Sequence, residues 1–413
     1  MTHPAAHIVA RTTTHTGVNG SMVIAIVWTA LMGFQLLRSI RIDAYELSQG
    51  RIDLLGYWLA FLISLTLGLW LLERGRMMLV TLYLVMLLVT YITLVITLTA
   101  PSQPIVSFLI SRYGVAMWFV LGVGFSAVID IITMARQRRY FGHARNGIMV
   151  VLVLLGLQSL RVANEILADP VQTLSYQSVA SSTTIFLLVM AGVIVALWGE
   201  KTPIPVSLAY IGIGTVLVAA VALTQSTLIV ALWLGIFLVF FGQSFRTRRL
   251  LGKIALLTVL LLGVGYFMQT EAYEHFTTKT RFAIFFASSG QFTSWTSRIS
   301  LLSTFSDQFA VSPIFGHFQA EIVAGVGEGY YVHSLPLAFL THTGLIGTTL
   351  FFSAFFLLIR KRTIIQEGRD FSEIHMGRMM WIILGVGTIS AFLSWPPIWF
   401  MLGALCKRSM RNN

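Results

Sequence analysis

Long stretches without any Asp, Glu, Lys or Arg are the feature that most constrains this chain. They include residues 12–37, 54–72, 77–111, 113–129, 146–160, 170–199, 202–245, 254–270, 329–359 and 379–406. A transmembrane helix needs about 20 predominantly apolar residues, and most of these stretches reach or approach that length. Only 11% of the 413 residues are charged, whereas soluble domains carry about 25%. The sequence therefore predicts an all-α polytopic membrane protein and excludes most classes of soluble enzyme.

The longest of these stretches are predicted to fold back on themselves. Residues 202–245 are long enough for two spans joined near Gln225–Ser226, and Trp395-Pro396-Pro397 interrupts 379–406 because proline lacks a backbone N–H. About twelve transmembrane helices are predicted, beginning near Ser21, Leu54, Met77, Gly114, Asn146, Val179, Pro203, Ser226, Lys253, Ser334, Met376 and Trp395. The predicted segments are a disordered cytoplasmic tail at 1–20, helices 1–9 at 21–269, one large external loop with short amphipathic helices at 270–333, helices 10–12 at 334–406, and a cytoplasmic tail at 407–413.

The positions of Lys and Arg predict the orientation of the chain. Cytoplasmic connections of membrane proteins carry an excess of basic residues. With the N-terminus in the cytoplasm, 20 of the 28 basic residues fall inside and eight outside. Both termini are therefore predicted to be cytoplasmic. The net charge of +12 then follows from topology, and nucleic acid is not an expected partner.

The large loop at 270–333 is the predicted place for chemistry, because its composition is not that of a disordered segment. A helix that begins near Phe292 would put Arg298 on one face with Trp295, Leu302, Phe305 and Phe309. A guanidinium within an apolar stripe needs a partner or a wet cavity, and its planar fork matches phosphate. The alternative is that the stem of Arg298 lies along the membrane surface with its head group in water.

His333 stands at the predicted outer mouth of the tenth span. A histidine with a pKa near 6.5 can accept a proton from a sugar hydroxyl at neutral pH, although an interfacial structural histidine fits the same position. Arg161 and Arg281 could join Arg298 in an outer cluster of cations that binds a polyanionic lipid head group, or anchor helix ends. Tyr176 could contact a sugar or belong to the aromatic belt.

Other polar residues suggest structural roles. His342 lies well inside a predicted span and suits a buried polar contact. Asp130 is the one acidic residue placed in a span, and Arg136 or a neighbour is its expected partner. The single cysteine, Cys406, excludes a disulfide framework and a cysteine-ligated metal. No metal and no cofactor are expected.

Residues 298–347 resemble the Wzy-type polymerase and O-antigen ligase superfamily. The matching residues are Arg298 in Ser297-Arg298-Ile299, then Ser312-Pro313-Ile314-Phe315-Gly316-His317, then His333 leading into Leu335 and on to Gly344-Leu345-Ile346-Gly347. The chain departs from the family pattern at Thr224-Gln225-Ser226-Thr227, where Ser-Arg-Gly is common, and at Ser334, where asparagine is usual. A second phosphate-binding arginine would then come from elsewhere, and we suggest Arg161 or Arg281.

The resemblance implies an inverting glycosyltransferase in the bacterial inner membrane with a periplasmic site. Its donor would be a glycan on undecaprenyl pyrophosphate, polymerised into O-antigen or exopolysaccharide, with His333 and Arg298 as catalytic residues. Expected partners are the lipid-linked donor and acceptor and membrane lipids, and a chain-length regulator is a further candidate. Two alternatives stay open: a ligase that transfers glycan to lipid A–core, and a flippase or transporter of lipid-linked glycans, for which ionisable residues at mid-membrane would be expected.

Overall fold

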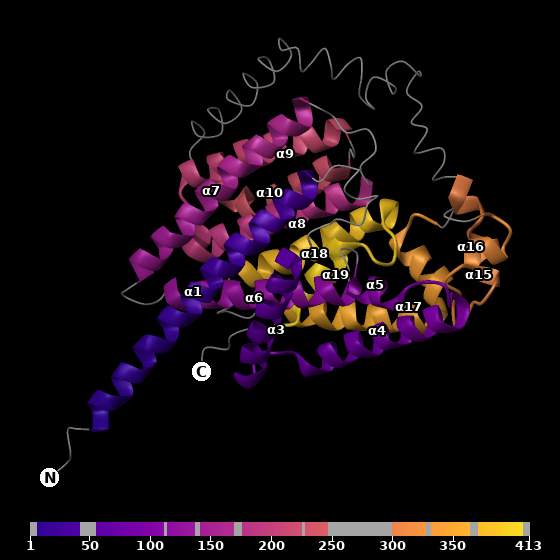
Figure 1. Cartoon of the computed structure of the whole chain (residues 1–413), viewed down its shortest axis with the longest axis horizontal. Coiled ribbons are helices and arrows are strands. Elements are labelled where there is room, and N and C mark those ends of the chain that lie inside the picture. Colours follow the sequence, from indigo (N-terminus) through magenta and orange to yellow (C-terminus); the bar gives the residue numbers. More distant parts are fainter. Residues whose placement is uncertain are drawn as a thin grey trace.

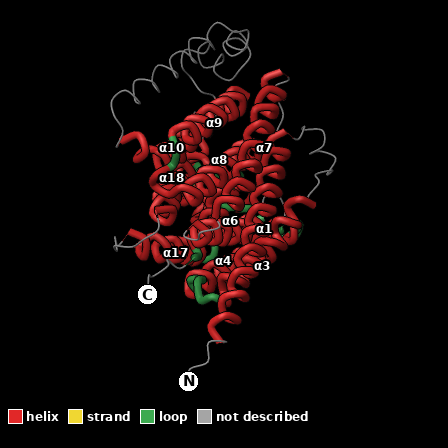
Figure 2. The backbone as a smooth tube through the Cα atoms, turned by 90° about the vertical axis from the view of Figure 1, so that its left-hand side faces the viewer, coloured by secondary structure: helices red, strands yellow, loops and turns green. Residues whose placement is uncertain are grey.

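The computed structural model describes residues 6–41, 55–110, 114–136, 141–168, 176–224, 228–246, 300–327, 332–363 and 371–407. Helices make up 86% of this part of the chain, and no β-strand occurs in it. Figures 1 and 2 show the helices packed as one bundle, with the N-terminal helix projecting from one end. The prediction of an all-α protein is therefore confirmed.

Eight helices in the described ranges are long and apolar enough to cross a membrane, which fits a multi-pass membrane protein. They lie within α1 (Ala6–Arg41), α3 (Leu55–Glu73), α4 (Leu79–Thr99), α6 (Val115–Arg136), α7 (Phe141–Ala168), α8 (Tyr176–Trp198), α9 (Ile204–Thr224) and α17 (Leu335–Thr363). The remaining elements are the short α5 (Ile105–Leu109), η1 (Gly199–Lys201), α10 (Leu228–Arg246), α15 (Phe305–Ala310), α16 (Ala320–Val323), α18 (Phe371–Ser390) and α19 (Pro396–Leu405).

The core of the bundle is built around α6 and α8, the most buried of the candidate spans. α19 packs closely against α6, where two glycines allow the backbones to meet. A Cβ atom at Gly122 would collide with the carbonyl oxygen of Phe400, and one at Gly403 with that of Phe119. Such close approach favours helix association where lipid supplies little hydrophobic drive. α3 and α4 lie at the periphery, and α4 runs beside α17 along one side of the bundle (Figure 1).

Charged side chains mark the two ends of the bundle. At one end, the buried Asp130 of α6 pairs with Arg76 and with Lys407, whose Nζ lies 2.7 Å from Oδ1. At the other, Glu165 of α7 holds Arg41 and Arg161, with Nε–Oε distances of 2.6 and 2.9 Å. Residues predicted to share a side of the membrane therefore meet at the same end. Burying Asp130 needs such cations, because an isolated buried carboxylate is costly.

Several sequence-based predictions need correction. The predicted span near Trp395 is α19, whose ten residues are too few to cross a membrane alone. α1 already begins at Ala6, inside the segment predicted as a disordered tail, because extending an existing helix costs little. Arg136, the suggested partner of Asp130, instead donates to the Ala196 carbonyl at 3.3 Å. The count of twelve spans is not confirmed, and the span predicted near Lys253 lies outside the described residues.

Candidate functional site

α17 is broken in its middle, and a second segment of the chain docks into the break. Gly344 has φ 61° and ψ −167°, which no helix allows. The segment Ser312–Phe318, called here the docked turn, lies against this point. His317 donates its backbone N–H to the Thr341 carbonyl at 3.0 Å. The docked turn therefore supplies a hydrogen-bond donor for a carbonyl group that lies just before the break.

The docked turn also accepts hydrogen bonds from the far side of the break. The backbone N–H of Leu345 donates to Pro313 at 2.9 Å, and that of Ile346 donates to Ile314 at 3.2 Å. These are the first amides after Gly344, so the second half of α17 begins with donors that no preceding turn of helix could satisfy. The docked turn thus caps this half-helix with its own carbonyl groups.

Two glycines make this contact sterically possible. Gly316 has φ 80°, and a Cβ atom there would lie 2.5 Å from both the Gly344 amide nitrogen and the His342 carbonyl oxygen. A Cβ atom at Gly344 would in turn collide with the Ile314 carbonyl oxygen. Both positions need the positive φ that glycine adopts without strain. The "P-x-x-G" and "G-L-I-G" segments are therefore the two halves of one backbone contact.

The docked turn is also fixed to α4. The Tyr91 hydroxyl donates to the Phe315 carbonyl at 2.7 Å, and the Phe318 N–H donates to Thr99 Oγ1 at 2.9 Å. The Phe318 ring meets Phe108 of α5 edge-on, with centroids 5.5 Å apart. The docked turn therefore joins α4, α5 and α17 into one unit.

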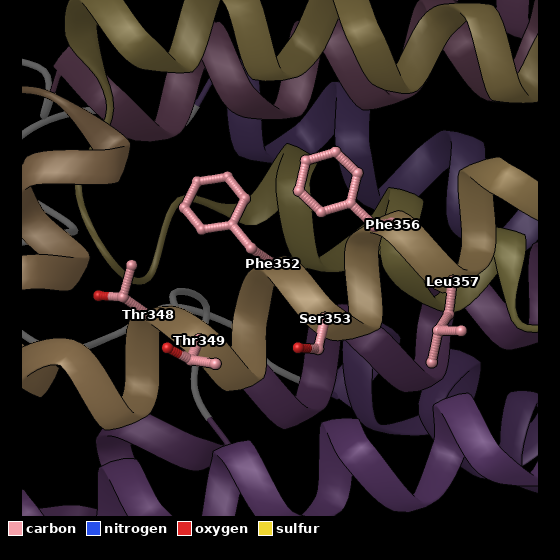
Figure 3. A pocket seen from close by; sticks show the side chains of 6 residues that line it. All are labelled: Thr348, Thr349, Phe352, Ser353, Phe356 and Leu357. Carbon is pink, nitrogen blue, oxygen red and sulfur yellow. The ribbon is translucent and has the colours of Figure 1, made fainter.

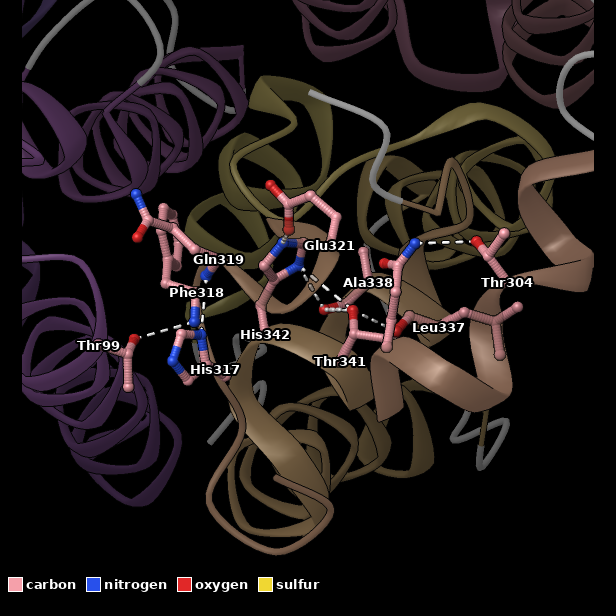
Figure 4. A network of polar contacts seen from close by, with 11 residues as sticks. Thr99, Thr304, His317, Phe318, Gln319, Glu321, Leu337, Ala338, Thr341 and His342 are labelled. Atoms are coloured by element: carbon pink, nitrogen blue, oxygen red, sulfur yellow. Dashed lines mark hydrogen bonds and ion pairs between the residues drawn. The ribbon is translucent and has the colours of Figure 1, made fainter. Parts of the chain in front are cut away.

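Four polar side chains form a cluster at the docked turn, namely His317, Glu321, Thr341 and His342 (Figure 4). His342 Nδ1 donates to the Ala338 carbonyl at 2.9 Å, so a neutral ring has its lone pair on Nε2. That Nε2 lies 3.9 Å from Oε2 of the buried Glu321. Thr341 Oγ1 is 3.5 Å from His342 Nδ1. The predicted role of His342 as a buried polar contact is confirmed.

His317 is the accessible member of this cluster. Its Nδ1 accepts the Gln319 backbone N–H at 3.2 Å, and partial burial lowers the pKa of its imidazole from the ordinary value of 6.5. The ring is therefore neutral at pH 7, with its proton on Nε2. In this state His317 can donate a hydrogen bond to a hydroxyl or phosphate oxygen.

His333 lies just before α17, half-buried between the buried Val332 and Ser334. Arg298 and Arg281 lie outside the described residues, so their roles stay predictions. The helix expected from Phe292 to Phe309 is interrupted at Thr304, and α15 begins at the next residue, Phe305. Thr304 Oγ1 donates to the Leu301 carbonyl and accepts from Gln308 Nε2, which satisfies polar groups at the interruption.

The two other predicted substrate contacts lie on α7 and α8. Arg161 and Arg41 both form an ion pair with Glu165. The two guanidinium groups and the one carboxylate together carry a net charge of +1. Both arginine side chains stay more than half exposed, and anion binding at Arg161 stays a prediction. Tyr176 is the first residue of α8, and its side chain lies outside the described part.

An open groove of about 580 Å³ runs along the second half of α17 (Figure 3). Its lining repeats with helical spacing and combines two aromatic rings and a leucine with three hydroxyl groups, namely Thr348, Thr349, Phe352, Ser353, Phe356 and Leu357. The Thr348 hydroxyl is already bonded to the Gly344 carbonyl at 2.7 Å. In the described part of the chain, no group of three or more His, Cys, Asp or Glu side chains could hold a metal ion.

Sequence reasoning did not identify His317 or Glu321 as members of a site. Their signal was present in part, because His317 directly follows the "P-x-x-G" segment. The contact between Glu321 and His342 spans 21 positions and could not be read from local spacing. Comparisons with protein-family models, curated proteins and solved structures found no match for this chain.

Proposed function

We propose that this chain is an integral-membrane glycosyltransferase that polymerises undecaprenyl-pyrophosphate-linked repeat units at the periplasmic face of the bacterial inner membrane. The observation that supports this most is the docked turn. The two segments behind the resemblance, at Pro313–Gly316 and Gly344–Gly347, form one hydrogen-bonded unit. His333 precedes the same helix, so one unit joins three of the motifs.

In the proposed reaction, His333 takes the proton of an acceptor hydroxyl while the hydroxyl oxygen attacks the anomeric carbon of the donor sugar. The bond from that carbon to the pyrophosphate oxygen breaks, and undecaprenyl pyrophosphate leaves with the electron pair. Arg298 neutralises the charge that develops on the leaving group. Arg161 or Arg281 would be a second cation, and Tyr176 a sugar contact. Both termini would lie in the cytoplasm.

The neighbourhood of the docked turn suits a sugar–phosphate substrate. His317 offers an Nε2–H donor, and the half-buried Gln319 follows it on the same short segment. Imidazole and amide side chains bond sugar hydroxyls through their donors and acceptors. A ligase that transfers finished glycan to lipid A–core would use the same chemistry with a different acceptor.

One observation favours a transporter of lipid-linked glycans as the second candidate. Discontinuous helices and ionisable groups at membrane depth are typical of secondary transporters. α17 is broken at Gly344, and His342 lies two residues before that break with Glu321 beside it. Transporter sites form between paired halves, however, and among the helices described only α17 contains such a break.

The glycan profile of a deletion strain separates these functions. The strain is complemented with wild type, His333→Ala or Arg298→Ala at matched expression. Single repeats at the surface without long chains would identify a polymerase, and long chains retained on the lipid carrier would identify a ligase. Normal glycan with both variants would contradict the assigned catalytic residues and favour transport.

A further inference from the structure

We infer that the docked turn is re-entrant: its tip at Pro313–Phe315 enters the hydrocarbon layer of the membrane, and the side chains of Ile314 and Phe315 contact lipid acyl chains, while His317 and Phe318 stay at the end of α4. The sequence alone places all of 270–333 in an external loop. The inference stands on the contacts of the docked turn with two spans and does not depend on the proposed activity.

The first measure of depth comes from α17. Its candidate span ends at Ile359, and the half of α17 from Leu345 to Ile359 is unbroken. At 1.5 Å per residue this half is about 22 Å long, whereas the hydrocarbon layer is about 30 Å thick. Pro313 and Ile314 accept hydrogen bonds directly from the Leu345 and Ile346 amides. If Ile359 lies at one face of the layer, the tip backbone therefore lies inside it, short of the opposite face.

The second measure comes from α4, whose 21 residues are about 32 Å long and match the thickness of the hydrocarbon layer. Phe318 is bonded to Thr99, the last residue of α4, while Phe315 is bonded to Tyr91, eight residues earlier. Eight residues correspond to about 12 Å of helix. The docked turn thus descends along α4 from its end toward the membrane interior.

The carbonyl groups of the docked turn meet the condition for entering a membrane. Irregular backbone occurs at membrane depth only where protein satisfies its polar groups. The four consecutive carbonyls from Ser312 to Phe315 accept hydrogen bonds from Gly316, Leu345, Ile346 and the Tyr91 hydroxyl. No Asp, Glu, Lys or Arg lies between Asp307 and Glu321, so entry buries no charged side chain.

The exposed side chains at the tip identify lipid as the partner. Ile314 is 54% exposed and Phe315 61% exposed. Leu345 and Ile346, whose amides meet the same turn, are also exposed. The two segments that meet at this contact thus expose four large apolar side chains at the depth of a span, where the surrounding solvent is hydrocarbon. In water their exposure would be unfavourable.

Site-directed spin labelling measures this depth. Single cysteines at Ile314 and Phe315, in a Cys406→Ala background, carry a nitroxide label in phosphatidylcholine–phosphatidylglycerol proteoliposomes. Collision rates with oxygen, which concentrates in hydrocarbon, are compared with those of a water-soluble nickel chelate. Leu87 on α4 is the hydrocarbon reference, and Ser306 beside Asp307 is the aqueous reference. We expect both tip labels to give the same ratio of oxygen to nickel-chelate collision rates as a label at Leu87. A ratio like that of a label at Ser306, at either position, would overturn the inference.

Photocrosslinking tests the unmodified protein, in case a labelled variant misfolds. Wild-type protein is reconstituted with a phospholipid that carries a diazirine on its acyl chain, irradiated, and mapped by mass spectrometry. We expect lipid adducts on the peptide containing Ile314 and Phe315, as on the α4 peptide containing Leu87. Adducts on the α4 peptide alone would refute lipid contact at the tip.

Discussion

Replacing Gly316 with alanine tests the contact between the docked turn and α17. The residue has φ 80°, and a Cβ atom would lie 2.5 Å from backbone atoms of His342, Thr343 and Gly344. Backbone atoms cannot rotate away as a side chain can, so the docked turn must withdraw. Withdrawal breaks the hydrogen bonds that Thr341, Leu345, Ile346 and Tyr91 make with this segment.

The expected cost follows from these losses. Left-handed backbone costs a residue with a Cβ atom roughly 1–2 kcal/mol, and each lost hydrogen bond costs about 0.5–1.5 kcal/mol. The free energy of unfolding should therefore fall by about 3 kcal/mol or more. At roughly 2 °C per kcal/mol for a large chain, the Tm should fall by about 6 °C. Tryptophan fluorescence during heating in detergent measures the change.

Gly325→Ala is the matched control. Gly325 has φ 74°, but a Cβ atom at this position would meet no heavy atom within 4 Å beyond its two chain neighbours. It therefore carries the left-handed strain without the collision, and its Tm should fall by about 2–4 °C. If Gly316→Ala lowers the Tm no more than Gly325→Ala does, the close contact between the docked turn and Gly344 is refuted.

Three further outcomes are expected from thermal unfolding. Asp130→Ala leaves Lys407 buried without its carboxylate and should cost about 3–5 kcal/mol, as broken buried ion pairs do. Gly403→Val should force α19 away from the Phe119 carbonyl and lower the Tm and the yield of monodisperse protein. Burial lowers the pKa of His317 in the folded state, so the unfolded state binds more protons below pH 6.5 and stability falls as the pH drops from 7 to 5. His317→Gln should reduce that pH dependence.

Each of these outcomes has a control. Asp130→Asn combined with Lys407→Met should be less destabilising than Asp130→Ala, because it removes a buried cation together with its partner. Gly212→Ala on α9 meets no atom within 4 Å and should leave the Tm unchanged or raise it slightly. Equal pH dependence in wild type and His317→Gln would show that other groups set the acid sensitivity.

The sequence predicted most of the spans, because a span depends on a local run of apolar residues. Predicted starts near Leu54, Val179 and Ser334 lie within one residue of candidate spans beginning at Leu55, Val179 and Leu335. The prediction was wrong at the span expected near Trp395, because the helix that follows, α19, has only ten residues and is too short to cross a membrane alone. An apolar composition does not show how far a helix extends through the bundle.

The candidate site was harder to predict because it depends on contacts between distant residues. The break at Gly344 exists because Pro313 and Ile314 supply acceptors for the following amides. The local sequence around Gly344 looks like any apolar span containing a glycine. The resemblance identified both segments and their order along the chain. It did not indicate that the two segments are in contact. Likewise the pair of Glu321 and His342 follows from the docked turn, not from periodicity.

A reaction with purified components tests the proposed function most directly. Wild-type protein in proteoliposomes is given undecaprenyl-pyrophosphate-linked repeat units, and polymer length and released undecaprenyl pyrophosphate are measured. His333→Ala is compared with His143→Ala, which changes an exposed histidine of α7 near the end of the bundle marked by Asp130. We expect polymer from wild type and His143→Ala, and a rate at least about 100-fold lower from His333→Ala, as loss of a general base implies. No polymer from wild type, or undiminished synthesis by His333→Ala, would contradict the account.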